Sequence, residues 1–213
     1  MQKVQFIQQE ARRQGKRVYR VDIDFKNAFN AMSQAALSQV MRMFKIPDVD
    51  LLEQIYEGAT VRLAPNHEES ATITFNTSVA QGSITSLQLF INALLCMQTV
   101  TGQNEDISHG LQIGKDQKGD NQRDENGYQF NNIGFIDDIS IFADTLEGMQ
   151  TLLNVMQEFT AWCGMQINVK KTYLLVIDND KKRREQEPAL LLTINRETLQ
   201  AMNLNYTCRY LGY

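Results

Sequence analysis

The sequence predicts an α+β fold in which helices back one antiparallel sheet, and three observations support this prediction. The 213 residues are 43% hydrophobic and 22% charged, which is the balance of a globular chain that can bury a sizeable core without disulfides. Residues 146–162 place apolar side chains at clean helical spacing. Strand-like and helical segments follow one another in the order β-α-α-ββ-α-ββ-α-β-β, which is typical of helices packed against one sheet.

The first half of the chain begins with a short amphipathic helix, in which Val4, Ile7 and Ala11 recur at helical spacing before Gly15 ends it. Alternating apolar residues predict the first strand, and good helix formers predict a helix that ends before Pro47. In chain order we expect a helix over 3–14, a strand over 17–25, helices over 28–44 and 48–57, a hairpin of 60–63 with 72–79, and an apolar helix over 86–100.

The second half opens with a segment rich in Gly, Asn, Gln and Asp, which we interpret as a polar insertion at about 102–132 within one domain spanning 1–213. In chain order the elements after it are two strand-like runs within 133–143, a helix over 146–162, strands over 165–167 and 173–177, a solvated basic turn at 181–184, and a hairpin of 190–194 with 208–213.

Charge and cysteine content exclude several classes of protein. Lys and Arg number 21 against 25 Asp and Glu, so the net charge of −4 has the wrong sign for wrapping nucleic acid, and a strong electrostatic clamp should lie outside this chain. Cys96, Cys163 and Cys208 are far apart and indicate buried, reduced thiols of an intracellular protein. The apolar run 89–97 is too short to cross a membrane, and Asn92 interrupts it.

Two predicted strands end or turn at aspartates. Asp24 follows an apolar alternation, and the pair Asp137 and Asp138 lies between two apolar runs, where a tight turn would expose both carboxylates. Acids in such strands are costly unless they are paired with cations or metal ions. If the strands are neighbours in one sheet, Asp24 and Asp137 converge, and three carboxylates around one point suit Mg²⁺.

Each of these acids also has an ordinary interpretation. On the Asp137-Asp138 pair alone, a solvated turn is the commoner explanation, because turn chemistry uses aspartate so often. Asp22 shares a strand face with Asp24 and is either a supporting acid or, as we favour, a surface residue.

Five short motifs occur in a fixed order from residue 24 to the C-terminus. They are Asp24-Phe25-Lys26-Asn27-Ala28-Phe29, Gln81-Gly82-Ser83 with Ser86 and Leu89-Phe90, Phe135-Ile136-Asp137-Asp138, residues 164–172, and Tyr210-Leu211-Gly212. Together they resemble the palm of reverse transcriptases, most closely those of non-long-terminal-repeat (non-LTR, LINE-like) retrotransposons. Each motif alone is weak, but five in the family's order make a specific signal.

The resemblance implies a polymerase palm, with a ferredoxin-like antiparallel sheet backed by helices, and RNA-directed DNA polymerase activity. Asp24, Asp137 and Asp138 would hold two Mg²⁺ ions, for which Mn²⁺ could substitute. These ions would activate the primer 3′-hydroxyl and stabilise charge on the α-phosphate and the leaving pyrophosphate. Lys171 would neutralise or protonate that pyrophosphate, or is simply a solvated lysine. Asn168 would order its own loop.

Four further residues would contact substrate by the same resemblance. Phe29 would lie under the incoming sugar and exclude a ribose 2′-hydroxyl, although core packing explains a phenylalanine there equally well. Gly82 would let the backbone approach the nucleotide and the template, with Gln81 and Ser83 as polar contacts. The following residues, 84–87, lack the prolines that the family usually has, so the geometry of this loop is less certain than that of the carboxylates.

The resemblance also implies partners and missing parts. The partners are an RNA template, a DNA primer or target, dNTPs, and the fingers, thumb and endonuclease parts of a longer polyprotein; no membrane is involved. The fingers would lie upstream of residue 1, and the thumb connection would start at about 206–213. An intracellular protein is expected, nuclear or cytoplasmic, with the nucleus favoured by resemblance. The alternative function is an inactive remnant or nucleic-acid-binding scaffold that retains the palm fold; Phe29 disfavours a polymerase that uses ribonucleotides.

Overall fold

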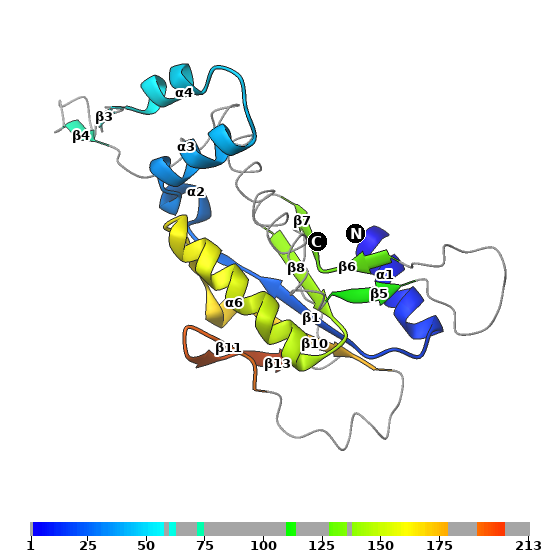
Figure 1. The fold of residues 1–213 in the computed structure, drawn as a ribbon. Helices are drawn as coiled ribbons and strands as arrows, with labels where there is room; N and C mark the ends of the chain where they lie inside the picture. The colour runs from blue at the N-terminus through cyan, green and yellow to red at the C-terminus, as the bar shows by residue number, and fades with distance from the viewer. Residues whose placement is uncertain are drawn as a thin grey trace.

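The computed structural model describes residues 2–57, 60–62, 72–74, 110–113, 128–135, 138–178 and 191–202. At its centre is a five-stranded sheet in the order β13-β10-β1-β8-β7 (Figure 1). The strands are β1 (Val18–Ile23), β7 (Asn132–Phe135), β8 (Asp138–Ala143), β10 (Tyr173–Ile177) and β13 (Gln200–Met202). β1 is central and antiparallel to both β8 and β10, whereas β13 runs parallel to β10. The sheet is therefore mixed, which corrects the expectation of a purely antiparallel one.

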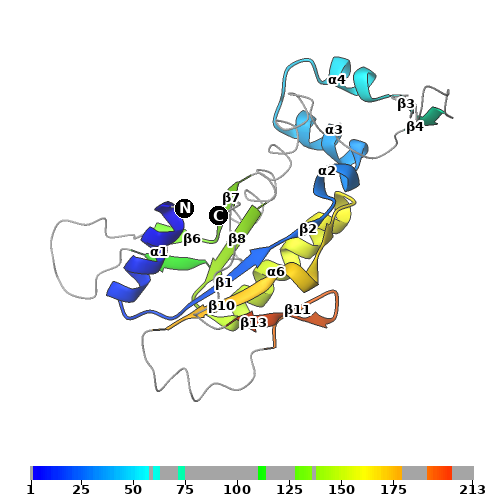
Figure 2. The same ribbon diagram turned by 180° about the vertical axis from the view of Figure 1, so that it is seen from behind.

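The helix α6 (Leu146–Trp162) covers one face of this sheet, in front of the strands in Figure 1 and behind them in Figure 2. Its buried side chains pack with those that β1 and β8 present to that face, such as Val21 and Ile141. Burying a Leu or Met side chain is worth about 1.5–3 kcal/mol, so this packing is the main support of the fold. Thr145 caps the helix, since its hydroxyl accepts a hydrogen bond from the Gly148 N–H at 3.1 Å.

The opposite face of the sheet is covered at one end by α1 (Gln2–Arg13). A second buried cluster joins Ile7 and Ala11 of α1 to Val18, Phe142 and other apolar residues. This cluster includes Leu111 of β5 (Leu111–Ile113), which is fully buried and pairs with β6 (Tyr128–Phe130). Part of the segment that we expected to be a polar insertion therefore forms an antiparallel pair, because isolated apolar residues within polar sequence are enough to anchor short strands.

The segment predicted as one helix over 28–44 forms two, α2 (Ala28–Ala31) and α3 (Gln34–Met43). Met32 adopts an extended conformation between them, and the Ser33 hydroxyl accepts from the Ala36 N–H at 3.4 Å to start α3. Serine favours this capping role over a place inside a helix. The helix α4 (Val49–Tyr56) follows, and then the antiparallel pair β3 (Thr60–Arg62) and β4 (Thr72–Thr74).

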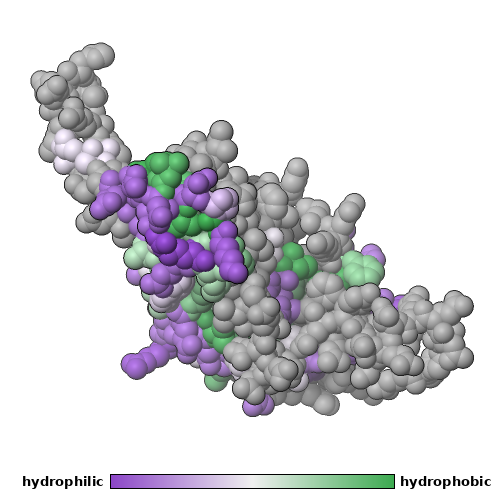
Figure 3. Space-filling view, turned by 45° about the horizontal axis from the view of Figure 1, so that its top comes forward, coloured by the Kyte–Doolittle hydropathy of each residue, from purple (hydrophilic) through white to green (hydrophobic). Residues whose placement is uncertain are grey.

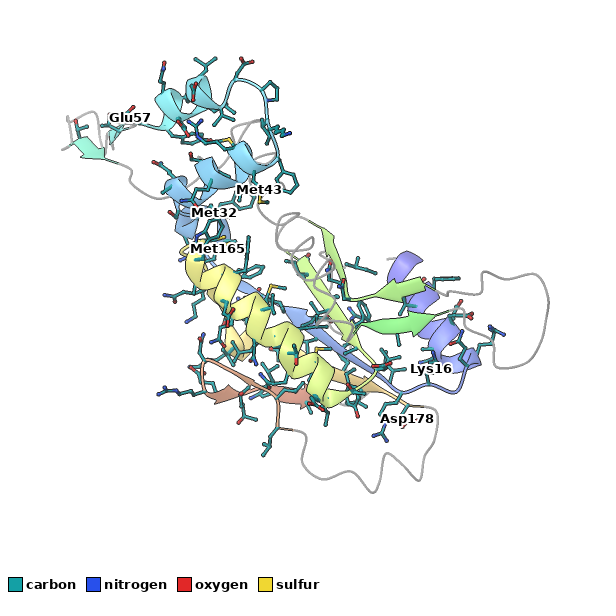
Figure 4. All side chains as sticks on the ribbon, in the orientation of Figure 1. Lys16, Met32, Met43, Glu57, Met165 and Asp178 are labelled. Atoms are coloured by element: carbon teal, nitrogen blue, oxygen red, sulfur yellow. The ribbon has the colours of Figure 1, made fainter. Side chains whose placement is uncertain are left out.

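The junction of α2 with the end of α6 is tight. Met32 and Met165 are both buried and lie close together there (Figure 4). Gly164 has a φ of +78°, and a Cβ at this position would lie 3.1 Å from the Ala31 carbonyl oxygen. Only glycine combines this backbone conformation with such a close approach. The chain then turns back through β9 (Gln166–Ile167), which pairs with β2 (Phe25–Lys26), and the 3-10 helix η3 (Val169–Lys171).

The expected hairpin of 190–194 with 208–213 lies partly outside the described residues, since 190 and 208–213 are not described. β11 (Thr193–Ile194) pairs with β12 (Glu197–Thr198). Asn195 and Arg196 between them both have positive φ values, 53° and 66°. A two-residue turn of this kind suits the twist of a hairpin, and asparagine accepts it readily. Two glutamines of α6 hold the hairpin, since Gln150 bonds Thr193 and Gln157 bonds Asn195.

Most other predicted elements agree with the structure, including the first strand, the helix over 146–162 and the strand over 173–177. Cys163 is a buried thiol that forms no disulfide with a described residue. Within the described part of the chain, no helix is long and apolar enough to cross a membrane. Coloured residues on the face in Figure 3 are mostly hydrophilic, with hydrophobic ones showing between them. The expected helix over 86–100, the turn at 181–184 and the thumb connection at 206–213 lie outside the described residues.

Candidate active site

Two of the predicted carboxylates lie at one end of the sheet, where β1 ends and β8 begins. Ile23, the last residue of β1, pairs with Ile139 of β8. Asp24 follows Ile23 and Asp138 precedes Ile139, so the two aspartates flank this last pair at the same end of the two strands. Both aspartates are half-buried. The strands are thus neighbours, as the convergence of the two aspartate motifs requires.

The segment between β7 and β8 is two residues long. Phe135 pairs with Asp138, so only residues 136 and 137 separate the two strands. Asp138 is therefore the first residue of β8 rather than the tip of the turn. Asp137 lies outside the described residues, and among those that are described no group of three or more His, Cys, Asp and Glu side chains could hold a metal ion.

The turn from Asn168 to Thr172 encloses Asp24. The Asn168 Nδ2 donates to Oδ2 of Asp24 at 2.9 Å, and the Asn168 backbone N–H donates to the Asp24 carbonyl at 2.8 Å. The Asp24 N–H donates to Oγ1 of Thr172 at 3.3 Å, and that hydroxyl donates to the Asn168 carbonyl at 3.0 Å. Asn168 thus does more than order its own loop, because it binds the carboxylate directly.

Asp22 is buried, which corrects the expectation that it is a surface residue. One carboxylate oxygen, Oδ1, accepts from the Arg20 Nε at 2.7 Å and from the Ser140 hydroxyl at 2.5 Å. The other oxygen, Oδ2, is buried without a hydrogen-bond partner. Asp22 and Ser140 are directly opposite in the register, so this contact links β1 to β8 two residues before Asp24 and two residues after Asp138. Polar residues at alternate positions of two apolar strands were the sequence signal for this network.

Two other predicted residues are described. Phe29 lies on α2, half-buried against the main core, where packing and a substrate contact are both compatible with its position. Lys171 is exposed at the end of η3, three residues after Asn168, whose carbonyl accepts its backbone N–H at 2.9 Å. Lys171 therefore belongs to the same turn that binds Asp24. The predicted contacts Gln81, Gly82 and Ser83, and the motif at 210–212, lie outside the described residues.

The far end of β1 is fixed by a separate ion pair. Arg17 Nε lies 2.7 Å from Oδ2 of Asp178, whose side chain is fully buried. Figure 4 shows Asp178 and Lys16 at this end of the molecule. Burial raises the pKa of the nearby Tyr19 hydroxyl, partly opposed by the positive charge of Arg17. This end therefore anchors the sheet, and the chemistry-bearing residues gather at the other.

Comparisons with known proteins agree with these motifs. The chain is 26% identical over 168 residues to the Retrovirus-related Pol polyprotein from type-2 retrotransposable element R2DM of Drosophila melanogaster, covering 78% of this chain and 14% of the polyprotein. Telomerase structures have a similar fold. That from Candida tropicalis, in complex with a fragment of telomeric RNA, has a TM-score of 0.58 at 10% identity and covers 82% of this chain and 29% of its own. The corresponding Candida albicans telomerase has a TM-score of 0.58 at 11% identity, covering 84% and 30%.

The match to a protein-family model covers more of the chain than any of these three similarities. The model for "Reverse transcriptase (RNA-dependent DNA polymerase)" matches residues 1–213. With the retrotransposon polyprotein, it confirms the resemblance drawn from the five motifs. The chain whose β1 and β8 carry these aspartates therefore belongs to the reverse transcriptase family.

Proposed function

We propose that this chain is the palm of an RNA-directed DNA polymerase that joins dNTPs to a primer 3′-hydroxyl by a two-metal mechanism. The observation that supports this most strongly is the register of β1 with β8, which pairs Ile23 with Ile139, the residues next to Asp24 and Asp138. The carboxylate oxygens of Asp24 and Asp138 are ligands that Mg²⁺ prefers, and Asp137, which precedes Asp138 in the sequence, would complete the set. Two bound ions would supply charge stabilisation for the attacking and leaving oxygens.

The chain's own residues have distinct parts in this proposal. Asp24, Asp137 and Asp138 hold the cations, and the exposed Lys171 donates charge or a proton to the leaving pyrophosphate. Gln81, Gly82 and Ser83 contact the nucleotide and the template.

The test is primer extension on an RNA template with Mg²⁺, using both this chain and a version extended upstream. Asp24→Asn and Asp137→Asn should each lower the rate at least about a hundredfold, because several kcal/mol of transition-state stabilisation depends on the ions. Asp144→Asn is the matched control, because Asp144 is exposed and follows the other end of β8. Equal extension by the wild type and Asp137→Asn in the extended version would contradict the assignment of metal ligands.

The proposed role of Phe29 concerns the choice of sugar. A ring under the incoming nucleotide would clash with a 2′-hydroxyl, so Phe29→Val should allow ribonucleotides to be incorporated while dNTP incorporation continues. The measurement is the ratio of kcat/KM for dNTP and rNTP with the extended version. Continued exclusion of ribonucleotides by Phe29→Val would leave Phe29 as a core residue alone.

A catalytically inactive scaffold with the palm fold is the second candidate function. It is favoured by the net charge of −4, which opposes independent binding of a template. The chain spans only 14% of the retrotransposon polyprotein that it resembles, and we propose that other parts of such a polyprotein provide the grip on nucleic acid. Extension activity in the extended version that is lost in Asp24→Asn would exclude the scaffold.

A further inference from the structure

Three groups of Asp24 form hydrogen bonds with residues of one short turn. Its N–H, its carbonyl and one carboxylate oxygen are each bonded to Asn168 or Thr172. We call these two residues the Asp24 clamp. The hydrogen bond from Thr172 Oγ1 to the Asn168 carbonyl joins the two residues of the clamp to each other. The clamp therefore fixes both the backbone of Asp24 and the rotation of its side chain.

The clamp occupies one carboxylate oxygen and leaves the other open. Asn168 bonds Oδ2, and Oδ1 accepts no hydrogen bond from any described residue. An amide donor is neutral, so it orients the carboxylate without cancelling the negative charge that a cation needs. A lysine or arginine in the same place would compete with a metal ion for Asp24. Asparagine is the chemistry expected of a group that supports a metal ligand from behind.

The clamp is built on a rigid part of the molecule. Thr172 is fully buried, and Ile167 and Val169 on either side of Asn168 belong to the main core. Ile167 pairs with Phe25, the residue after Asp24, across β2 and β9. The turn and the carboxylate are thus fixed to the same strands, and a supporting residue is effective only when its own position is fixed in this way.

We propose that Asn168 is a positioning residue that aims Oδ1 of Asp24 at a divalent cation, with Thr172 holding Asn168 in place. This inference rests on the proposed function, in which Asp24 is a metal ligand. It goes beyond that function because it assigns the metal affinity of the site partly to a residue that touches neither the ion nor the substrate.

The test measures Mn²⁺ binding to this chain by electron paramagnetic resonance, with thermal unfolding of every variant as a check on folding. Loss of an outer-shell partner typically weakens metal affinity about 10- to 100-fold, so Asn168→Ala should raise the Mn²⁺ dissociation constant by about that factor. Asn154→Ala is the matched control, because Asn154 is exposed on α6 and its side chain bonds Gln150 rather than Asp24. It should bind Mn²⁺ as the wild type does.

A second pair of variants tests the clamp without altering Asn168. Thr172→Val keeps the shape of the side chain and removes the hydroxyl, whereas Thr172→Ser keeps the hydroxyl. Thr172→Val should weaken Mn²⁺ binding, and Thr172→Ser should restore most of the affinity. In primer extension by the upstream-extended version, raising the metal concentration should rescue Asn168→Ala, since a weakened site can still be filled. A merely structural defect would not respond to metal.

The outcomes separate the two proposals. If Asp24→Asn loses Mn²⁺ binding while Asn168→Ala and Thr172→Val keep the wild-type affinity, the positioning role is overturned and the metal role of Asp24 stands. If Asp24→Asn binds Mn²⁺ as the wild type does, or the wild type binds none at millimolar concentration, the proposed metal site itself fails.

Discussion

Lys170 and Lys171 are neighbouring exposed lysines on η3, and they offer a matched comparison within one turn. Both side chains carry one positive charge and both are exposed to solvent. Only Lys171 occupies the lysine position of the reverse transcriptase motif, and only Lys171 donates its backbone N–H to the Asn168 carbonyl. A role in pyrophosphate departure should therefore belong to one of the two side chains and not to the local positive charge in general.

We expect Lys171→Ala to lower kcat of the upstream-extended version at least about tenfold. Proton donation in a transition state typically raises the rate about 10²- to 10⁴-fold, and a positive charge without proton donation gives part of that increase. Lys170→Ala should change kcat by less than about twofold. The measurement is single-turnover primer extension by the wild type and both variants. Similar losses in both variants would mark Lys171 as an ordinary solvated lysine.

At the scale of the element, β1 contains a buried ion pair whose removal should be informative. Arg20 and Asp22 are each 9% exposed in their side chains, and Ser140 of β8 bonds the same carboxylate oxygen. Removing one partner of a buried pair leaves a stranded charge, which costs about 3–5 kcal/mol. Arg20→Met should lower the free energy of unfolding by that amount.

The double variant Arg20→Met with Asp22→Leu should regain most of this loss, because apolar residues of similar volume often replace a buried pair without net cost. Urea denaturation of the two single variants and the double variant gives the coupling free energy. A double variant as unstable as Arg20→Met alone would show that lost packing of the arginine stem accounts for the effect.

The contact between α3 and α4 predicts a pH dependence. The pKa of Glu53 is lowered from its ordinary value of 4.5, first by the hydrogen bond from Ser38 and then by the one from Arg42. The folded state therefore holds this proton more weakly than the unfolded chain does. The stabilising contribution is complete above about pH 4.5 and is lost as the pH falls through the lowered pKa.

Below pH 4.5 the thermal midpoint of the wild type should consequently fall more steeply than that of Glu53→Gln, which cannot titrate at this position. The comparison uses thermal unfolding followed by circular dichroism between about pH 3 and 7, a range that includes the pKa values at which carboxylates usually titrate. Glu57→Gln serves as the control, because no hydrogen bond of the described residues involves its side chain. Parallel curves for the wild type and Glu53→Gln would contradict the assigned contact.

The elements were predictable from the sequence where one local signal dominated. The helix over 146–162 and the strand over 173–177 have their expected bounds, because periodicity and length agree there. Where tertiary context decides, prediction was wrong. The break at Met32 depends on a cap and on the close approach of Gly164 to Ala31, and the pairing of β13 with β10 depends on residues far apart in sequence.

The same division holds for the candidate site. Motif order led us to predict Asp24 and Asp138 as site residues, and the register of β1 with β8 brings their neighbours Ile23 and Ile139 together. The bond from Asn168 to Asp24 was not predictable, because it joins two motifs whose relation exists only after folding. Ser140 was missed for a similar reason, since a polar position in an apolar strand is a signal that does not say which carboxylate the side chain contacts.

At the scale of the whole molecule, intramolecular contacts occupy several of the six Lys and Arg side chains within residues 1–20. Arg13 bonds Glu10, Arg17 bonds Asp178 and Arg20 bonds Asp22. Cations that are already paired with carboxylates release few counterions when nucleic acid approaches. Together with the net charge of −4, this predicts weak binding of nucleic acid by the isolated chain.

The affinity of the isolated chain for an RNA–DNA primer duplex should therefore fall less than about tenfold between about 50 and 200 mM salt, because a drop of 10³ or more requires about six phosphate contacts. Fluorescence anisotropy of a labelled duplex gives this salt slope. The upstream-extended version should have a steeper slope. A steep slope for the isolated chain would show that its surface grips phosphates without help.

The central place of β1 has a consequence for biosynthesis. Both of its neighbours come from much later in the chain, since β8 begins at Asp138 and β10 ends at Ile177. A nascent polypeptide that has emerged only as far as its midpoint holds an apolar strand with neither neighbour in place, and long-range closure of this kind is slow. If a ribosome stalls before β10 has emerged, the incomplete chain should accordingly be prone to aggregation. Its Asp24 would be exposed and would lack the hydrogen bonds from Asn168 and to Thr172.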